Sequence, residues 1–448
     1  MGEKPHISMK NIVAIIILII TIVVGGAFYS KYNYHDYTKS VREKGKTSFS
    51  RDGNVKYSKT KSYKIENREY NDAMFYKTIQ VKPNTPYRIT CKVKTENVNT
   101  ETGKYYGGAQ ISIKDTTECS KSVIGTSDWT EITFMFNSKN RETIDVGFRL
   151  GGYNEKVVGT AWFSDFKIEE GNLDTNNEWN MVCFIIQNID VTVNIANQPT
   201  NVKISMTRNE IENIKSNMAR MVNTIKNMSG NQMTMTYDIF EIATPLKTLS
   251  YDVDNEYYID PANIRDILEE YLDKKEYDYI FVATRFGDLN ESKNVLVHDW
   301  IGLGGMDYYE IGFSNIRLPD TDNSYLYKYS SKNTFPEEVF IHEFLHTLER
   351  NEKEYGNASV ASLHDYEKYG YTQDSIDGLR KWYTAYMQNM ITNTNGNKAG
   401  LTSNIYTSKP IHKSNFKYSY ELKVLKEPQN AIEEISSIIN RIKEMFAS

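Results

Sequence analysis

The stretch IHEFLHTLERNEKEYG, residues 341–356, decides how the second half of this chain folds. Its apolar side chains recur at the i, i+3, i+4 and i+7 spacing of one helix face, at Ile341, Phe344, Leu345 and Leu348. Upstream, Thr334 and Glu337 have the spacing of a capping box, and Gly356 is suited to end a helix. The sequence therefore predicts an amphipathic helix that buries one face and ends at about Gly356.

Two histidines lie four residues apart in this helix, His342 and His346, with a glutamate directly after the first. At this spacing the two imidazoles stand one turn apart on the same face and can bind one zinc ion together. Glu343 lies beside such an ion without ligating it and can accept a proton from its water. The pattern within an amphipathic helix favours a metal site over two incidental surface histidines.

HEFLH at 342–346 resembles the HExxH motif of the zincin-type zinc metallopeptidases, and the resemblance covers roughly residues 178–425. It implies an α+β catalytic domain, which we expect over residues 178–448. It also implies a strand above the helix whose free edge pairs with an extended substrate, and 299–316 occupies the expected position.

The third zinc ligand is left open by the sequence. The metzincin pattern requires glycine and histidine where this chain has Glu349 and Glu352. His364 is favoured, because imidazole is the commonest third partner when a further histidine follows nearby. Asp365 and then Glu367 are the alternatives, whereas Glu349 lies on the histidine face but reaches the same ion poorly.

The expected reaction is hydrolysis of a peptide bond in a protein or peptide, with Zn²⁺ as cofactor and Glu343 as general base. Tyr369 or Tyr371 is expected to donate a hydrogen bond to the oxyanion. Peptides of the cell wall are a narrower alternative substrate. The alternative function is a surface protein that binds glycan or protein and carries a catalytically silent zincin-like domain.

Residues 51–172 show a different period. Five short runs alternate apolar and polar residues, which predicts an antiparallel β-sandwich: PYRITCKVKT, GAQISIKD, DWTEITFMF, TIDVGFRLGG and TAWFSDFKIEEG. The stretches at 81–95, 127–136 and 159–171 resemble the jelly-roll carbohydrate-binding modules attached to many bacterial extracellular enzymes. This resemblance implies a cell-surface glycan as a possible partner.

Aromatic residues of this segment can stack on sugars, namely Tyr105, Tyr106, Tyr153 and Trp162. The competing interpretation, which we favour for Trp162 and Trp129, is that they pack in the sandwich core.

After residue 175 helices and strands alternate, as expected for an α/β or α+β domain. Thr207 and Glu210 form a capping box at the start of a helix that ends before Gly230. The last 22 residues, 427–448, have the pattern of an amphipathic helix that docks on this domain.

The N-terminus predicts the location of the protein. Residues 11–30 carry no charge, and as a helix they are long enough to cross a bilayer. Lys4 and Lys10 favour a cytoplasmic start, so residues 1–30 are expected to be a single-pass membrane anchor with the bulk outside. The alternative is a signal peptide cleaved near Ala27, which would make the protein secreted. Residues 31–50 are polar and predict a juxtamembrane spacer.

Charge and cysteine content exclude other classes. The net charge is −5 and there is no long basic run, so nucleic acid is not an expected partner. The three cysteines form no C-x-x-C pair, which argues against a thiolate metal site. Cys91 and Cys119 both fall in the expected sandwich and could pair in an exported protein.

Overall fold

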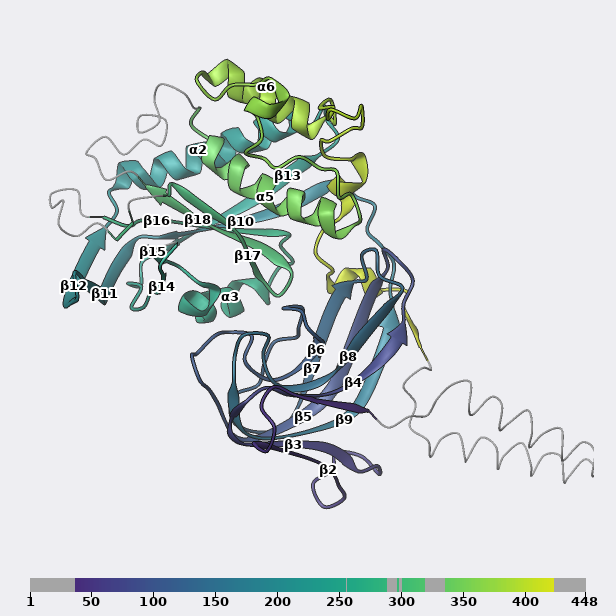
Figure 1. Ribbon diagram of the computed structural model, residues 1–448. Helices are drawn as coiled ribbons and strands as arrows, with labels where there is room; N and C mark the ends of the chain where they lie inside the picture. The colour runs from purple at the N-terminus through teal and green to yellow at the C-terminus, as the bar shows by residue number, and fades with distance from the viewer. Residues whose placement is uncertain (1–36, 255, 288–295, 298–299, 319–334, 423–448) are drawn as a thin grey trace, which may run out of the picture.

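The structure is a computed structural model that describes residues 37–254, 256–287, 296–297, 300–318 and 335–422. The expected membrane anchor at 1–30 and the expected C-terminal helix at 427–448 lie outside the described residues. Among the residues that are described, no helix is long and apolar enough to span a membrane. The described chain forms two parts, which we call the sandwich (β1–β9) and the α/β domain (β10–η4) (Figure 1).

The sandwich consists of two antiparallel sheets. One has the order β1 (Thr38–Val41), β4 (Ala73–Gln80), β8 (Thr143–Gly151), β6 (Gly108–Ile113). The other has the order β2 (Thr47–Asp52), β3 (Ser62–Asn71), β9 (Val157–Glu170), β5 (Pro86–Thr100), β7 (Gly125–Asn137). Alternate residues of β5 are buried, as a strand with one face on the core requires: Tyr87, Ile89, Cys91 and Val93. The five alternating runs of the sequence correspond to β5–β9.

The prediction of a juxtamembrane spacer over residues 31–50 is wrong from Thr38 onward. Strands β1 and β2 lie there, and each is an edge strand of one sheet of the sandwich. Edge strands are short and rich in polar residues because part of their surface faces solvent, so their sequences resemble a linker. Cys91, Cys119 and Cys183 are free and buried, which corrects the possible pairing of the first two.

The α/β domain is built on a five-stranded sheet. Its order is β13 (Thr234–Ile242), β10 (Glu178–Ile186), β16 (Tyr279–Arg285), β18 (Ile311–Leu318), β17 (Gly302–Tyr308). The first four strands are parallel, and β17 is antiparallel to β18. Two small antiparallel pairs flank this sheet, β11 (Asn188–Ile195) with β12 (Gln198–Ser205) and β14 (Ser250–Asp252) with β15 (Glu256–Tyr258).

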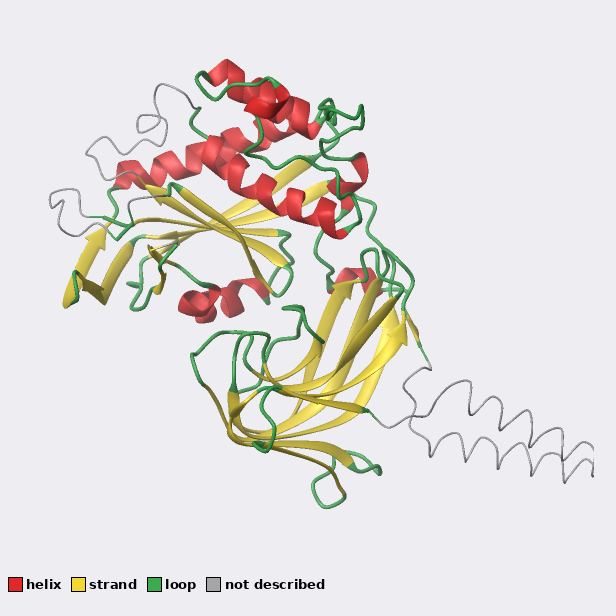
Figure 2. Ribbon diagram, in the orientation of Figure 1, coloured by secondary structure: helices red, strands yellow, loops and turns green. Residues whose placement is uncertain are grey.

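Helices cover both faces of this sheet. One face carries α2 (Arg208–Met228), α5 (Glu338–Glu354) and α6 (Ile376–Met387), and the other carries η1 (Pro261–Ile264) and α3 (Arg265–Leu272) (Figures 1 and 2). Successive residues of β10 point alternately to the two faces: Met181, Cys183 and Ile185 pack under α5, whereas Val182 and Phe184 pack toward α3. Short 3₁₀ helices complete the domain: η2 (Glu367–Tyr369), η3 (Ser403–Thr407) and η4 (Lys413–Phe416).

The predicted boundaries hold for α2 and for the end of α5, but α5 begins later than the capping box of Thr334 and Glu337 predicts: its first residue is Glu338, and Glu337 is an N-cap without a side-chain hydrogen bond. The capping box of Thr207 and Glu210 at the start of α2 is confirmed. Helix α5 ends at Glu354, and Gly356 follows with φ +99°, a backbone conformation that suits glycine. Thr334, the first residue of the capping box expected before α5, lies outside the described residues.

The turn that joins β17 to β18 is strained. Tyr308 pairs with Ile311, so Tyr309 and Glu310 form a two-residue turn, and their φ angles are +48° and +71°. Two-residue hairpin turns with positive φ at both positions favour Asn-Gly, because bulkier residues clash with their own backbone. This left-handed conformation costs roughly 1–2 kcal/mol per residue. Neighbouring contacts must therefore hold the turn.

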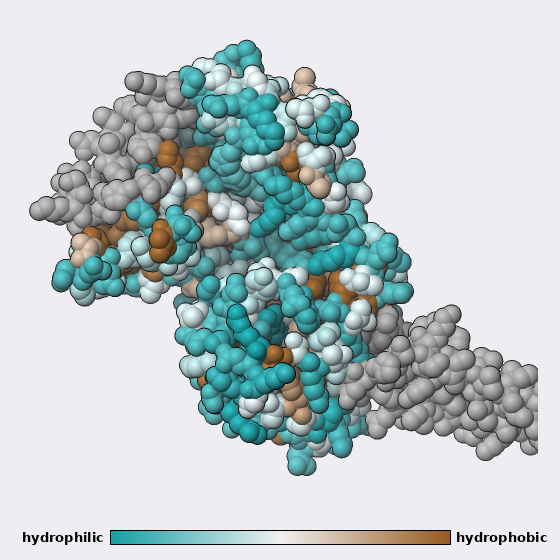
Figure 3. Space-filling view, viewed as in Figure 1, coloured by the Kyte–Doolittle hydropathy of each residue, from teal (hydrophilic) through white to brown (hydrophobic). Residues whose placement is uncertain are grey.

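The two parts are also joined by the end of the described chain. After η4, the strand β19 (Tyr420–Glu421) returns to the sandwich and pairs with Glu169 and Glu170 of β9. The α/β domain is therefore enclosed in sequence between strands of the sandwich. The face that Figure 3 shows is mostly hydrophilic, with small hydrophobic patches on both parts.

Candidate metal centre

Helix α5 presents two histidines side by side. Ile341, Phe344 and Leu345 of this helix are fully buried, which fixes its rotation against the sheet. His342 and His346 therefore lie on the adjoining face, where their side chains are 16% and 24% exposed. The Nε2 atoms of the two rings are 3.1 Å apart. Two nitrogen ligands of one tetrahedral zinc lie roughly 3.3 Å apart, so this pair fits a shared ion.

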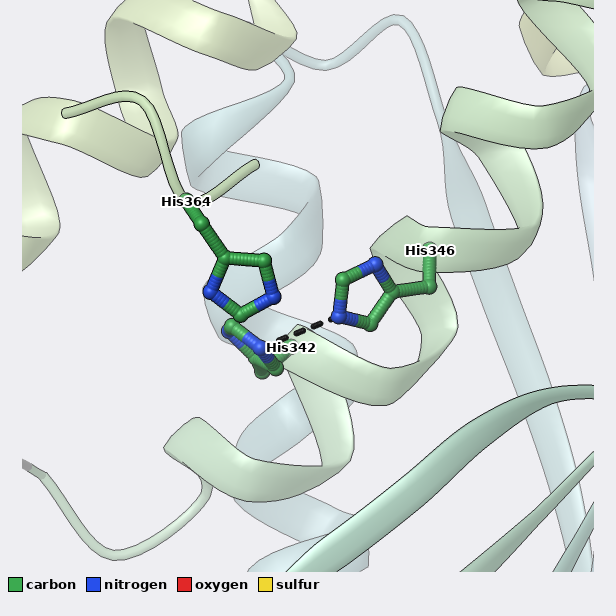
Figure 4. Close-up of side chains that lie close together, drawn as sticks. All are labelled: His342, His346 and His364. Atoms are coloured by element: carbon green, nitrogen blue, oxygen red, sulfur yellow. Dashed lines mark hydrogen bonds between the residues drawn. The ribbon is translucent and has the colours of Figure 1, made fainter. Parts of the chain in front are cut away.

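His364 reaches the same place from the loop after α5 (Figure 4). The backbone just before it is pinned on both sides. The Leu363 N–H donates to Glu349 Oε2 at 3.0 Å, and Trp382 Nε1–H of α6 donates to the Leu363 carbonyl at 2.9 Å. The Tyr386 hydroxyl also donates to the carbonyl of Ala361 at 3.0 Å. This loop is therefore held between α5 and α6, and the ring of His364 is directed at the helix.

The three histidines form a group whose ligand atoms all lie within 4.8 Å of one another. The ring of His364 lies 5.0 Å, centroid to centroid, from each of the other two rings. In Figure 4 the three rings point toward one another, with the dashed line between His342 and His346. We call this group the histidine cluster. Three neutral imidazoles around one point are a donor set that suits zinc and leaves a fourth position for water.

Tyr383 of α6 orients the first of these rings. Its hydroxyl donates to a carboxylate oxygen of Glu338 and lies 2.9 Å from Nδ1 of His342. Because the hydroxyl proton is committed to Glu338, the oxygen accepts from the Nδ1–H of His342, and Nε2 keeps its lone pair for an ion. Burial, together with the neighbouring histidines, lowers the pKa of His342 to about 3, which favours the same neutral ring.

Glu349 connects the other two histidines of the histidine cluster. Its Oε2 lies 3.7 Å from Nδ1 of His346 and accepts the N–H of Leu363, the residue before His364. Burial raises the pKa of this carboxyl, but hydrogen bonds from His346, Lys353 and Leu363 outweigh burial and lower it to about 2. An ionised carboxylate here fixes one ring and the backbone that carries another.

Glu343 is buried beneath the edge strand β17 and is only 5% exposed. A Cβ atom placed on Gly302 would lie 2.3 Å from Oε1 of Glu343, and one on Gly304 would lie 2.7 Å from Oε2. Only glycine permits this close approach of the strand to the carboxylate. Burial raises the pKa of Glu343 to about 7, whereas a backbone hydrogen bond from Gly304 acts in the opposite direction. This carboxyl can therefore exchange a proton near neutral pH.

The other residues predicted for the site lie around it rather than in it. Asp365 is paired with Lys368 at 3.1 Å, and Glu367 is exposed at the start of η2, so neither belongs to the histidine cluster. The rings of Tyr369 and Tyr371 pack on Trp382, with centroids 6.1 and 5.4 Å away.

Four residues that matter at the site were not found from the sequence as supporting groups. Tyr383 lies 41 positions from His342, and no local pattern connects them. The glycines at 302 and 304 could not be related to Glu343 before the strand was placed. Glu338 precedes His342 by one helical turn, and this spacing was the one available signal.

Two of the four aromatic residues expected to bind sugar are buried, and a third, Tyr106, is half-buried. Tyr105 is 8% exposed and contacts the α/β domain, and Trp162 is 5% exposed and donates from Nε1 to Asp52 at 3.0 Å. Tyr153 is 43% exposed. Tyr57, which is 47% exposed, forms an edge contact with the half-buried Trp129 at a centroid distance of 5.7 Å. An accessible aromatic pair thus exists on the sandwich, and the half-buried position of Trp129 corrects the expectation that it packs in the core.

A scan against protein-family models and a comparison with curated proteins give no match for this chain. Solved carbohydrate-binding modules are similar to part of it. One, solved with β-1,4-galactotriose, is 11% identical over 31% of this chain and 92% of its own, with a TM-score of 0.22. The C-terminal family 22 module of Clostridium thermocellum Xyn10B is 12% identical over 30% and 90%, with a TM-score of 0.20. A third, described as belonging to a β-sandwich superfamily, is 14% identical over 31% and 58%, with a TM-score of 0.21. A likeness at these TM-scores implies no ligand or activity for this chain.

Proposed function

We propose that this protein is a zinc-dependent hydrolase of peptide bonds, of the zincin type, with His342, His346 and His364 as the zinc ligands. The observation that carries the proposal is the convergence of three imidazoles from α5 and the following loop, in the same helix as a buried glutamate. The supporting contacts of Tyr383 and Glu349 add to it, because ligating histidines are normally held by such partners.

A bound zinc ion supplies a Lewis acid that polarises a carbonyl and makes water acidic enough to lose a proton near neutral pH. Glu343 accepts this proton and later delivers it to the departing amine. His342 and His346 keep their Nε2 lone pairs available because their Nδ1 atoms face Tyr383 and Glu349, respectively. Tyr369 and Tyr371, which follow the His364 loop, are the proposed donors to the oxyanion, and phenylalanine at each position tests that role.

The substrate we propose is an extended segment of a protein or peptide, including peptides of the cell wall. Strand β17 is the last strand of the described sheet, so one row of its backbone groups has no partner strand among the described residues. An extended peptide can pair with such an edge. Because β17 passes directly over Glu343, a peptide on this edge would run beside the histidine cluster. With residues 1–30 as an anchor, the activity would lie outside the membrane.

Two substitutions test the proposal, with zinc content and peptide hydrolysis measured for each purified full-length variant. Glu343→Gln should retain zinc and lose roughly 10²–10⁴-fold in kcat/KM, the contribution of a positioned general base. His364→Ala should lose both zinc and activity. Glu212→Gln, a half-exposed glutamate on α2, is the matched control and should behave as the wild type. Wild-type activity in Glu343→Gln, or full zinc content in His364→Ala, would reject the assignment.

A second candidate function is a surface protein that binds glycan or protein through the sandwich and whose α/β domain is catalytically silent. The accessible pair of Tyr57 and Trp129 favours it, since sugar rings stack on exposed aromatic faces. Trp129→Ala should then abolish retention on a glycan array, while Glu343→Gln leaves retention unchanged. If neither the wild type nor its variants bind any glycan presented, the glycan form of this candidate is excluded.

A further inference from the structure

The sandwich contacts the strained turn between β17 and β18 through Tyr105, a residue of the loop between β5 and β6. Its hydroxyl donates to the carbonyl of Asp307 at 2.5 Å, and Tyr309 donates from its own hydroxyl to the Tyr105 carbonyl at 3.1 Å. The ring of Tyr105 packs against those of Tyr308 and Tyr309, with centroids 5.5 and 5.3 Å away. Tyr105 thus holds both the end of β17 and the first residue of the turn.

A second contact joins the same turn to the helix of the histidine cluster. Lys139, in the sandwich loop between β7 and β8, lies 3.5 Å from Glu310 of the turn and 2.6 Å from Glu354 of α5. It also lies 3.3 Å from Glu118 of the sandwich. One buried ammonium group therefore connects the sandwich, the turn and α5.

Strand β17, which runs from the region of Glu343 to the turn, is also held by a contact from α5. Arg350 donates from Nη1 to the carbonyl of Gly305 at 3.2 Å, at the bulge where the register of β17 shifts. Gly302, just before this bulge, and Gly304, within it, lie against Glu343. Because glycine leaves this bulge flexible, the position of β17 depends on outside contacts, at the bulge from Arg350 and at the turn from Tyr105 and Lys139.

We propose that the sandwich is a positioning element for the metal-site domain: Tyr105 and Lys139 hold the Tyr309–Glu310 turn in its left-handed conformation and thereby set the position of β17 over Glu343. The expected effect on catalysis rests on the proposed function, but the expected effect on the position of β17 does not. A turn with these two residues would relax without outside contacts, because its conformation is unfavourable for side chains with a Cβ atom. Ligand binding to the sandwich that moves Tyr105 would then alter the site.

The test measures hydrogen exchange of the β17 amides, zinc content and peptide hydrolysis in the full chain. Tyr105→Ala should speed exchange across Gly302–Tyr308 by about tenfold, because a buried hydrogen bond and a ring contact are lost. Zinc content should not change, and kcat/KM should fall. Tyr105→Phe keeps the ring and removes only the hydroxyl, so it should show a smaller rise while the fold is retained. Tyr70→Ala, on the sandwich surface, is the matched control.

A rescue variant separates positioning from simple support. Replacing the turn by its preferred pair, Tyr309→Asn with Glu310→Gly, should slow β17 exchange again in the Tyr105→Ala background, because the hairpin then forms without outside contacts. A purely structural role of Tyr105 in joining the two parts would not be rescued by a change in the turn.

Each outcome decides one of the two proposals. Wild-type exchange of β17 in Tyr105→Ala overturns the positioning role, whether or not the chain cleaves peptides. Faster exchange that the Asn-Gly turn does not slow also overturns it. If exchange follows the expected pattern but no peptide is cleaved by the wild type, the positioning role stands and the proposed function fails.

Discussion

If the proposed function holds, a single methyl group on Gly302 should disable the proposed active site while zinc still binds. In Gly302→Ala the new Cβ atom would lie 2.3 Å from Oε1 of Glu343, 2.6 Å from its Cγ and 2.7 Å from its Cδ. Ordinary contacts begin at 3.4 Å, so the carboxylate must retreat by about 1 Å.

The magnitude follows from this displacement. A misplacement of about 1 Å at a catalytic group costs roughly 10²-fold in rate, so kcat/KM should fall by about that factor. Overpacking of a buried site costs about 1–3 kcal/mol of folding free energy, and the melting temperature should fall accordingly. The zinc content should stay at the wild-type value, because the three atoms nearest the new Cβ all belong to Glu343 and none to a histidine of the cluster.

The assay is the cleavage of internally quenched peptides, with zinc measured by mass spectrometry on the same samples. Gly53→Ala is the matched control, because the nearest atom to its Cβ position is Lys61 Cε at an ordinary 3.6 Å. In the double variant Gly302→Ala with Glu343→Asp, the shorter side chain should restore stability but not activity. Wild-type stability and kcat/KM in Gly302→Ala would show that Glu343 is not confined, and the reasoning would be refuted.

Two further predictions concern charge. Glu349→Gln should lower zinc affinity roughly 10–100-fold, measured by competition with a chelator, because His346 and the His364 loop lose a shared carboxylate; an unchanged affinity would remove Glu349 from the support of the site. At Glu310, burial raises the pKa from 4.5 to about 7. Among the charged groups that face it, Lys139 and Arg350 lower the pKa, whereas Glu118 and Asp307 raise it. The folded state therefore binds the proton of Glu310 more tightly than the unfolded state does. The resulting contribution to folding stability is complete below about pH 4.5 and is lost as pH rises through 7. Glu310→Gln should remove this loss, so the melting temperature of the variant should gain on the wild type between pH 5 and 8, whereas a difference independent of pH would contradict the prediction.

Local sequence patterns were sufficient to predict those site residues whose positions are set by the geometry of a single helix. The four-residue spacing of His342 and His346 and the apolar face beside them follow from helical geometry, which the sequence states directly. His364 was favoured for its chemistry alone, and the structure brings it to the other two. Its approach depends on Trp382 and Glu349, whose contacts with the loop are tertiary.

The remainder depends on contacts between distant segments. Tyr383 reaches His342 only because α6 packs beside α5, and Gly302 matters only because β17 crosses Glu343. Tyr105 shows the same limit in the sandwich: an aromatic residue in a polar loop suggested a sugar platform, yet it is buried against a turn more than 200 positions away. Strand β1 was missed because an edge strand needs few apolar residues.

The two-residue strand β19 has a consequence for how the molecule assembles. Its pairing with β9 closes a loop of roughly 250 residues, and bringing such distant ends together costs about 5 kcal/mol in chain entropy. The pairing of two exposed residues does not offset this cost alone. Strand β19 can therefore pair with β9 only after the intervening sheet and helices have folded and brought it close to β9. Pairing of β19 with β9 therefore indicates that the residues between them have already folded. In a chain whose α/β domain fails to fold, this end should stay unpaired and exposed.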